Sequence, residues 1–461
     1  MARKLSGRII ILFFSCLLFI PHPVLAAGSQ GQGKYNLILI VINSLRPDHL
    51  SLEGYPRATS PQIDILAREG IYFNQAFSQS CWTLPSLATI FTSQYLSSHK
   101  LDARDKKVSP DKRTFTQTLK ENGYATNAFT CGLDAAAVYG LEKGFDRYDV
   151  YSGSKPVGVF SDMLPKVKRS LRENQGKKFF LFLHSYDTHP PYRYNQGESF
   201  DKGYKGIFND LPMDYNTFKG IKDHVFYQKG KQAYISEEDF GHIIACYDDA
   251  IKQADNFIGS LIAELKALSL YDKTVIILCS DHGEELGDRG TFNRFGNQNL
   301  YQEVVRVPLI IRYPGLSKAR QGRRVSSLVG LVDIAPTALG LLGIPAKGND
   351  LQGINLSILI ESRPNKQKRK FIASESSRDK WALIRSDGWK LVHSPGNNEL
   401  YDLNRDPGEQ VNLSENKPQI LADMLQEFII WRQGHSDDSQ ADNRIEFDPK
   451  LIDNLRKSGY W

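Results

Sequence analysis

The feature that most constrains the fold is a set of short, nearly continuous apolar runs, each about the length of a buried β-strand. Residues 36–43 (NLILIVIN), 178–184 (KFFLFLH) and 274–280 (TVIILCS) are the clearest, and residues 307–312 (VPLIIR) form a fourth. Strands read this way when helices cover both faces of a parallel sheet. The runs therefore predict the centre of an α/β fold.

Helical periodicity separates these runs, at residues 62–69, 114–122 and 239–268. Strands that alternate with helices predict a mostly parallel central sheet flanked by helices. After about residue 345 the pattern changes. Residues 371–392 are typical of short antiparallel strands and residues 418–433 of a helix, which predicts a smaller C-terminal α+β subdomain.

The predicted organisation has four parts. Residues 1–27 form a secretory signal peptide, residues 34–345 a catalytic domain, residues 346–434 the C-terminal subdomain and residues 435–461 a tail. Within the catalytic domain, residues 193–237 are polar and aromatic with little periodicity. A stretch of this kind predicts an insertion or lid over the functional site.

The N-terminus has the three parts of an export signal. Basic residues at positions 3, 4 and 8 precede an apolar run at 9–20, and small residues follow, with cleavage expected near Ala26 or Ala27. Twelve apolar residues are short of the ~20 that span a bilayer. We expect a periplasmic or extracellular protein without a transmembrane segment once the signal is cleaved; an uncleaved signal would tether it to the membrane.

Charge argues against a nucleic-acid-binding protein, and cysteine usage argues against a thiolate metal cluster and a disulfide framework. Three of the six excess positive charges lie in the signal segment, and the remaining +3 is scattered along the chain, so no nucleic-acid partner is expected. The five cysteines include no CxxC pair, which argues against a thiolate metal cluster and a disulfide framework.

Polar side chains stand where three of the predicted strands end. Asn43, His184 and Asp281 follow or close the runs that begin at residues 36, 178 and 274. In a parallel sheet these ends lie at one edge, where ligands bind. The strand pattern alone therefore predicts a site there.

Two of these strand ends carry groups that can bind metal or move protons. Asp281 and His282 can ligate a divalent metal, although a structural turn in which Asp281 caps a helix explains the pair better when it is taken alone. His184, Asp187 and His189 lie within six residues and could hold a metal or protonate a leaving group. The alternative is a partly buried histidine bonded to the backbone.

Residues 81–87 (CWTLPSL) offer a candidate nucleophile. Cys81 is a thiol, but no neighbouring feature predicts a lowered pKa. The Thr83 hydroxyl is a weak nucleophile that needs a metal or a base. The segment could also be a loop leading into a helix, with Thr83 or Ser86 as its cap. These residues alone leave the three interpretations open.

A wider pattern of short motifs runs along the chain. The motifs are LIVINSLRPDH (39–49), SPQIDILAREG (60–70), FNQAF (73–77), WTLPS (82–86), SDHGEELG (280–287), LYQE (300–303), RVPLIIR (306–312), LVDIAPT (331–337) and LYDLNRDPGE (400–409). In this order they resemble the sulfatase family of the alkaline phosphatase superfamily. The resemblance implies a catalytic α/β domain with a smaller C-terminal subdomain. It also implies metal-assisted hydrolysis of a sulfate or phosphate ester through a covalent intermediate.

The resemblance also implies roles for individual residues. The family nucleophile, a cysteine or serine matured to formylglycine, falls on Thr83, whose extra methyl group blocks an aldehyde, so the chain resembles a threonine-type branch. One divalent metal would be held by Asn43, Thr83, Asp281 and His282. Calcium is expected first from the family, and Mn, Mg or Zn would also suit such ligands. His189 would assist the leaving group.

Several positions depart from the family pattern. Asn43 replaces the first metal aspartate, which removes one negative charge from the site. Leu87 replaces the arginine of the nucleophile motif, and Arg289 replaces a histidine. Arg289 or Arg294 could restore positive charge, and His184 and Asp187 are further candidates for the anion site.

Together these observations predict an exported hydrolase that cleaves a sulfate or phosphate ester, in a small molecule or a glycan, through Thr83. One alternative is a catalytically weakened pseudoenzyme that binds an anionic glycan or a partner, which Asn43 and Leu87 motivate. The other is a transferase of a phosphoryl-linked head group.

Overall fold

The computed structural model describes most of the chain after the predicted signal. The described residues are 34–151, 159–190, 192, 200–206, 208, 221–222, 225–228, 231–289, 299–346, 350–361, 369–377, 379–435 and 444. The predicted signal peptide (1–27), Arg294, much of the predicted insertion and nearly all of the predicted tail lie outside them.

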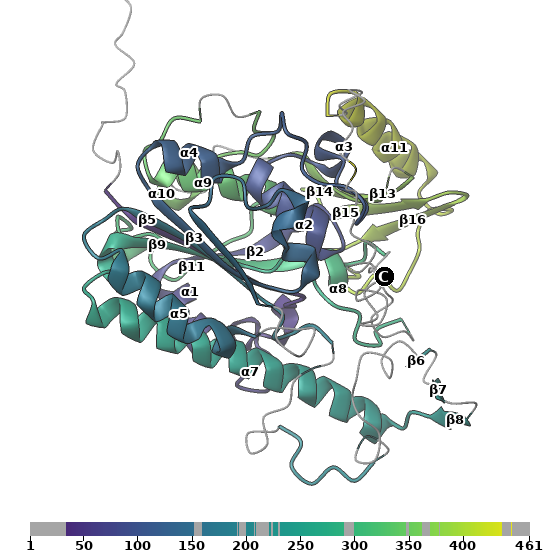
Figure 1. Ribbon diagram of the computed structural model, residues 1–461. Coiled ribbons are helices and arrows are strands. Elements are labelled where there is room, and N and C mark those ends of the chain that lie inside the picture. The colour runs from purple at the N-terminus through teal and green to yellow at the C-terminus, as the bar shows by residue number, and fades with distance from the viewer. Residues whose placement is uncertain are drawn as a thin grey trace, which may run out of the picture.

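A nine-stranded sheet forms the centre of the larger, N-terminal domain (Figure 1). Its order is β11-β2-β10-β9-β1-β5-β3-β4, with β12 also beside β2. The strands are β1 (Asn36–Ile42), β2 (Ile71–Phe77), β3 (Ala125–Cys131), β4 (Arg147–Tyr151), β5 (Phe179–Ser185), β9 (Thr274–Cys279), β10 (Arg306–Arg312), β11 (Arg323–Val325) and β12 (Val329–Gly330). The predicted α/β architecture with a mostly parallel sheet is confirmed.

Strand β10 is the exception to the parallel arrangement. It runs antiparallel to both of its neighbours, β9 and β2. β10 is next after β9 in the chain and lies directly beside it, and an antiparallel neighbour needs no helical crossover. In the described part of the connection, the only helix is the short α8 (Gln302–Val305).

Helices cover both faces of the sheet, and the side chains of β1 alternate between these two faces. Leu37, Leu39 and Val41 pack toward α2 (Thr83–Thr92), α4 (Phe115–Glu121), α9 (Ile334–Leu341) and α10 (Ser357–Glu361). Ile38, Ile40 and Ile42 pack toward α1 (Pro61–Glu69), α5 (Phe160–Glu173) and α7 (Glu237–Ala267). Because both faces are buried, every residue of this strand is apolar after Asn36.

Shorter elements complete this larger domain. They are α3 (Leu96–His99) and the 3₁₀ turns η1 (Pro47–His49), η2 (Ser51–Glu53), η3 (Leu133–Ala135), η4 (Ala137–Tyr139), η6 (Tyr271–Lys273), η7 (Lys318–Arg320) and η8 (Leu331–Asp333). Of the predicted insertion, the described residues form a small antiparallel sheet of β6 (Ile221–Lys222), β7 (Val225–Gln228) and β8 (Lys231–Tyr234).

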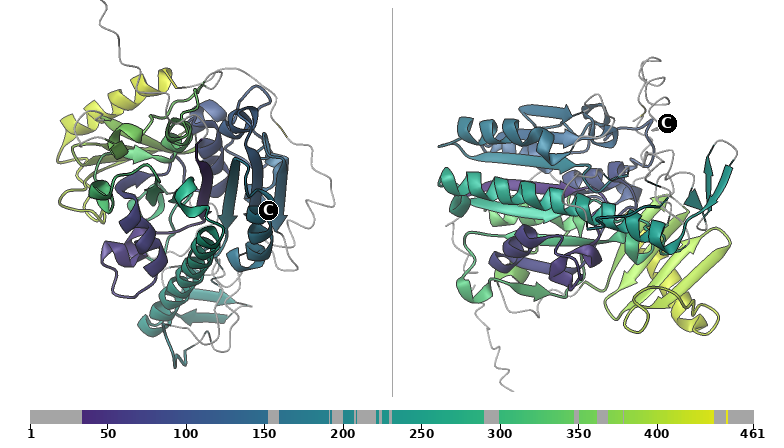
Figure 2. Two further views of the ribbon diagram at one scale, coloured as in Figure 1. Left: turned by 90° about the vertical axis from the view of Figure 1, so that its left-hand side faces the viewer. Right: turned by 90° about the horizontal axis from the view of Figure 1, so that it is seen from below.

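The C-terminal subdomain packs against one end of the main sheet (Figure 2). Its antiparallel strands pair in chain order: β13 (Phe371–Ser377), β14 (Lys380–Arg385), β15 (Trp389–Ser394) and β16 (Asn397–Asp402). Helix α11 (Pro418–Gln433) covers this sheet, with Phe428 stacked on Trp381 at 3.5 Å between ring centroids. The predicted antiparallel strands and final helix are thus present.

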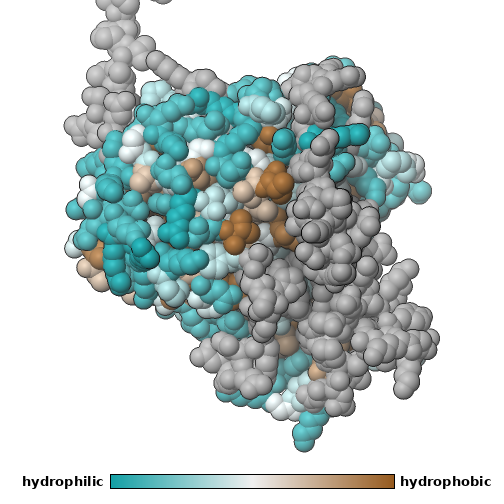
Figure 3. Space-filling view, viewed as in Figure 1, coloured by the Kyte–Doolittle hydropathy of each residue, from teal (hydrophilic) through white to brown (hydrophobic). Residues whose placement is uncertain are grey.

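Polar residues dominate the described part of the face in Figure 3, and only a few apolar side chains gather near its centre. Among the described helices, none is long and apolar enough to cross a bilayer.

Candidate active site

The carboxyl ends of three neighbouring strands bring the predicted site residues together. Asn43 directly follows β1, His184 lies at the end of β5, and Asp281 and His282 follow β9. The register places Val41 opposite both His184 and Cys279, so the three strands end side by side. The convergence inferred from the strand pattern is therefore present.

Thr83, the first residue of α2, also lies at this edge of the sheet, in contact with Asn43. Trp82 before it is extended, and no side chain caps the helix. Ser86 instead lies 3.0 Å from Ser78, hydroxyl to hydroxyl. The capping interpretation is therefore wrong, and the Thr83 hydroxyl faces the site. The N-terminus of a helix also favours negative charge on that oxygen.

The Thr83 hydroxyl and the His282 ring lie within hydrogen-bonding distance of each other. His282 Nδ1 lies 2.7 Å from the carbonyl oxygen of Gly283, which can only accept, so Nδ1 carries the proton. In the neutral ring, Nε2 then presents a lone pair, 3.3 Å from Thr83 Oγ1. The Thr83 hydroxyl can donate to it, which is the arrangement that activates a hydroxyl for attack.

Cys81 is a poor alternative nucleophile. Its side chain is completely buried, and burial raises the pKa of the thiol to about 11. The reactive thiolate is therefore scarce at neutral pH. The structure argues for Thr83 within this segment.

Asp281 is a buried carboxylate whose charge is compensated. Oδ1 accepts the backbone N–H groups of Ser44 (3.1 Å) and His282 (2.9 Å), and Oδ2 accepts from Asn43 Nδ2 (2.8 Å). Burial alone would raise its pKa, but the neighbouring imidazoles of His282 and His184 and the Ser44 amide hold the pKa well below its usual value.

Asn43 links Thr83 to Asp281. Its Nδ2 donates to Thr83 Oγ1 at 2.7 Å as well as to Asp281, and its Oδ1 accepts from Ser44 Oγ at 2.8 Å. Thr188 Oγ1 donates to its backbone carbonyl. The sequence analysis had not assigned Ser44 or Thr188 to the site. The only sequence signal for Ser44 was a second polar residue at the end of the strand.

Ser44 has an unusual backbone that the site requires. Its φ is 56°, in the left-handed region, which a serine rarely adopts. This conformation turns its N–H toward Asp281. Strain of this kind persists only where surrounding contacts hold it.

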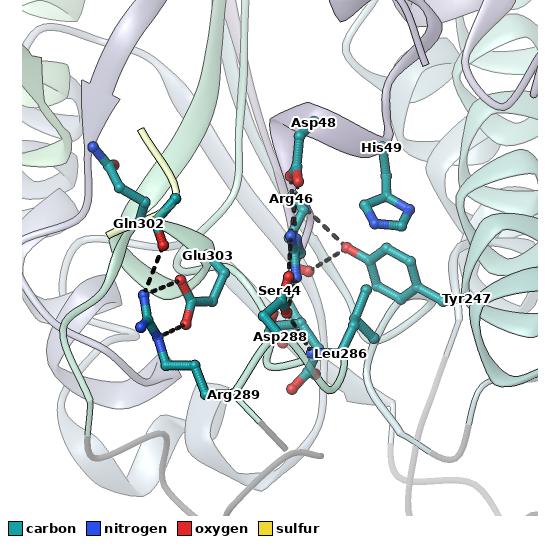
Figure 4. A network of polar contacts seen from close by, with 12 residues as sticks. Ser44, Arg46, Asp48, His49, Tyr247, Leu286, Asp288, Arg289, Gln302 and Glu303 are labelled. Atoms are coloured by element: carbon teal, nitrogen blue, oxygen red, sulfur yellow. Dashed lines mark hydrogen bonds and ion pairs between the residues drawn. The ribbon is translucent and has the colours of Figure 1, made fainter. Parts of the chain in front are cut away.

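A second network holds the turn that follows β1 (Figure 4). Tyr247 of α7 donates its hydroxyl to the Ser44 carbonyl (2.7 Å) and accepts from the Arg46 amide (2.9 Å). The Arg46 guanidinium bonds Asp48 (2.7 Å) and Asp288 (2.6 Å). This network fixes the strand end that presents Asn43.

His189 lies in the loop after β5, and its ring is tilted against Tyr186 with 4.7 Å between centroids. Burial lowers its pKa to about 4, so the ring is neutral at neutral pH. Nδ1 lies 2.6 Å from the carbonyl oxygen of Pro190, so Nδ1 carries the proton and Nε2 is an acceptor. As a proton donor to a leaving group, His189 would first have to be protonated.

The remaining predicted residues differ in their relation to the site. His184 is fully buried, with Nδ1 3.2 Å from the Cys131 carbonyl and Nε2 3.8 Å from Asp281 Oδ2. Asp187 accepts the backbone N–H of Phe160 at 3.0 Å, at the start of α5, which is a structural role. Arg294 lies outside the described residues.

Arg289 is bound to the C-terminal subdomain. Its Nε donates to Glu303 at 2.7 Å, and Nη1 donates to the Glu409 carbonyl at 3.1 Å. Its guanidinium stacks on Tyr301, 3.6 Å from the ring centroid, and points toward Glu303 (Figure 4). These contacts join the two parts of the molecule. They also use the Arg289 guanidinium, which we had predicted to bind an anion.

A cavity of about 1090 Å³ lies between the main sheet and the C-terminal subdomain. Neither Thr83 nor Asp281 lines it. Five arginines do, and each is paired with a carboxylate among the described residues: Arg46 with Asp48 and Asp288, Arg306 and Arg324 with Glu53, Arg369 with Asp333, and Arg385 with Asp387. We therefore do not assign an anion site to it.

The residues at the site do not fit a divalent cation as they stand. Across the described ranges, no three or more His, Cys, Asp or Glu side chains are grouped to hold a metal. Among the described residues, Asp281 is the only carboxylate hydrogen-bonded to the Asn43 side chain, and the donor end of the Asn43 amide faces both Asp281 and Thr83. A cation needs oxygen lone pairs in that direction.

Comparison with known proteins gives consistent results. The family model described as Sulfatase matches residues 35–344. A second, described as the C-terminal region of N-sulphoglucosamine sulphohydrolase, matches residues 290–432.

Individual relatives extend over most of the chain. Arylsulfatase K of Bos taurus is 25% identical over 459 residues, covering 87% of this chain and 84% of that protein. The Delta 4,5-hexuronate-2-O-sulfatase of Bacteroides thetaiotaomicron is 23% identical over 469 residues, covering 92% and 94%. The solved phosphonate monoester hydrolase of Agrobacterium radiobacter has the same fold, with a TM-score of 0.73, 20% identity and coverage of 90% and 100%.

Proposed function

The chain belongs to the sulfatase family, and we propose that it hydrolyses a sulfate or phosphate ester with Thr83 as the nucleophile. One observation carries the proposal. Thr83 Oγ1 faces the lone pair of His282 Nε2 at 3.3 Å, and the Gly283 carbonyl fixes the tautomer that leaves this lone pair available.

In the first step, the Thr83 oxygen attacks the sulfur or phosphorus and its proton passes to His282 Nε2. The new O–S or O–P bond forms as the bond to the alcohol oxygen breaks on the opposite side. That oxygen takes a proton from water or from a protonated His189, and the His282 imidazolium releases its proton to solvent. Asp281 Oδ2 lies 3.7 Å from Nε2 and stabilises the transient positive charge. Water then cleaves the ester on Thr83, with His282 again as the base.

Two groups assist this step. The Asn43 amide donates to Thr83 Oγ1, which orients the hydroxyl proton toward His282 and stabilises negative charge on the oxygen. An anionic ester bound near His189 would raise the pKa of that imidazole and so allow it to assist the leaving group. No step is assigned to a metal.

We favour a sulfate ester over a phosphate ester. A phosphate monoester carries more negative charge, and the side chains bonded to Thr83 are a neutral amide and an imidazole. Two relatives, an arylsulfatase and a hexuronate-2-O-sulfatase, are named for sulfate esters, which makes an aryl ester or a glycan the first substrates to test. The N-terminal signal pattern supports a periplasmic or extracellular location.

Two observations favour a second candidate, a pseudoenzyme that binds an anionic glycan without cleaving it. Leu87, at the position of the family's arginine, is completely buried in the hydrophobic core beside Leu84 and Ala88. Asn43 brings an uncharged amide where the family has a carboxylate. Both changes remove charge from the site.

Turnover separates the two candidates. We would assay an aryl sulfate, an aryl phosphate, a phosphonate monoester and sulfated uronate oligosaccharides with the wild type, Thr83→Ala and Thr92→Ala. Thr92 is a matched control at the far end of the same helix, where its hydroxyl donates to the Ala88 carbonyl and accepts the Gln94 N–H. Turnover lost in Thr83→Ala alone supports the hydrolase. Glycan binding without turnover in any variant supports the pseudoenzyme.

A further inference from the structure

We infer that the side-chain amide of Asn43 stands in the place of a metal ion and that this site assembles without a divalent cation. The inference deepens the proposed function, because it rests on the assignment of Asn43, Thr83 and Asp281 to the site. It does not require that the site turns over.

The first argument is the use of the amide hydrogens. Asn43 Nδ2 has two, and two acceptors face it, Thr83 Oγ1 at 2.7 Å and Asp281 Oδ2 at 2.8 Å. Its Oδ1 accepts from Ser44 Oγ at 2.8 Å. The amide therefore draws together two oxygens that a cation would otherwise bridge, and it does so as a neutral donor.

The second argument is the cost of the opposite orientation. Turning the amide end for end would place Oδ1 where Nδ2 now lies, 2.8 Å from a charged carboxylate oxygen with no proton between them. A cation in the same space, or a proton on Asp281, would be needed to relieve this repulsion. The observed orientation and a bound metal therefore exclude one another.

The third argument is charge. Asp281 already receives the backbone N–H groups of Ser44 and His282 in addition to the Asn43 amide, so its single negative charge is compensated. Burying a dication with only one carboxylate ligand would leave uncompensated positive charge in a site where Asn43 and Asp281 are fully buried. Lower ligand charge weakens binding of a hard cation.

The consequence for Asn43 is a positioning role. It holds Thr83 Oγ1 and Asp281 Oδ2 at a fixed separation and leaves the hydroxyl proton of Thr83 directed to His282. A single substitution, Asn43→Asp, would replace the donor with a carboxylate and recreate a site with two negative charges.

The test measures metal rather than activity. The full mature chain would be purified without chelator, analysed for bound elements, and melted with and without Ca²⁺, Mn²⁺, Mg²⁺ or Zn²⁺. We expect far less than one metal per wild-type chain and no change in melting temperature. Asn43→Asp should bind Ca²⁺ or Mn²⁺ on the order of a hundredfold more tightly and melt at a higher temperature when the ion is present.

The double variant Asn43→Asp/Asp281→Asn is the matched control. It keeps one carboxylate and one amide, so it should gain no metal. Near-stoichiometric metal in the wild type that disappears in Asp281→Ala would overturn the inference, as would a folded Asn43→Asp that gains none. If Asn43→Asp does not fold, the wild-type metal content still decides. A metal-free wild type without turnover would leave the inference standing and remove only the hydrolase.

Discussion

The side-chain nitrogen of Asn43 lies 2.8 Å from a carboxylate oxygen of Asp281, although the two residues are 238 positions apart in the chain. The contact forms because β1 and β9 are parallel neighbours whose carboxyl ends meet. It joins the polar groups of two strand ends into one site, which Thr83 enters from α2.

This contact predicts that Asn43→Asp destabilises the protein when metal is absent. The substitution replaces a donor with a second carboxylate beside Asp281, and an uncompensated buried charge costs about 3–5 kcal/mol. Denaturant unfolding at pH 8 in a chelator should show this loss, and Ca²⁺ should restore most of it. If Asn43→Asp and the wild type had the same unfolding free energy in chelator, this result would contradict the contact as described.

The pairing of Thr83 with His282 predicts a strong effect of His282→Gln. Loss of a general base lowers turnover by about 10²–10⁴-fold. Thr83→Ser keeps a hydroxyl at the helix N-terminus and should retain turnover within about tenfold. Steady-state rates, with circular dichroism to confirm folding, test both. Equal turnover rates in His282→Gln and the wild type would exclude His282 as the general base.

The low pKa of the buried His99 imidazole predicts that the protein is less stable in acid. It is buried, Nδ1 accepts the Leu101 N–H at 3.1 Å, and Nε2 lies 3.1 Å from Thr89 Oγ1. Burial lowers its pKa from 6.5 to about 3. As pH falls below about 6.5, the unfolded chain takes up the proton first, so the free energy of unfolding decreases by up to ~1.4 kcal/mol per pH unit until about pH 3.

His99→Gln tests this dependence. The glutamine amide offers an acceptor and a donor but does not titrate, so urea unfolding between pH 4.5 and about 7 should show a shallower slope than the wild type. Identical slopes would show that His99 is not the group responsible.

A buried ion pair predicts strong coupling in the C-terminal subdomain. Lys390 Nζ lies 2.6 Å from Glu409 Oε1, and both side chains are fully buried. Lys390→Met removes the ammonium from Glu409, which keeps the Arg289 guanidinium (3.4 Å) and the Gln302 N–H (2.7 Å). The substitution should therefore cost at most about 3–5 kcal/mol of unfolding free energy. The double variant Lys390→Met/Glu409→Gln should recover part of this cost. Additive effects in the double-mutant cycle would contradict the pairing.

The fold was predictable where the sequence pattern is uniform. Residues 36–42 are buried on both faces, and their continuous apolar run gave the strand, its burial and its place in a parallel sheet. Strands β2 and β3 were not predicted, because Asn74 and Gln75 interrupt the first and Thr126 and Asn127 the second. The reversed direction of β10 depends on its neighbours in space, which its own residues do not encode.

The site was predictable in composition but not in orientation. Strand ends and family motifs pointed to Asn43, Thr83, Asp281 and His282, and the structure brings all four together. The direction of the Asn43 amide depends on partners 40 and 238 positions away. Arg289 has the chemistry of an anion ligand, but its position beside Glu303 and Glu409 follows from the packing of the C-terminal subdomain.

The central claim, that Thr83 is the nucleophile of an ester hydrolase, is tested most directly by trapping the covalent intermediate. A reaction with an activated aryl sulfate or aryl phosphate would be quenched in acid during turnover, digested and analysed by mass spectrometry. The account predicts a sulfo or phospho group on Thr83, in the peptide that contains residues 81–87, and none in Thr83→Ala. Turnover that persists in Thr83→Ala, or a modified residue elsewhere in the chain, would contradict it.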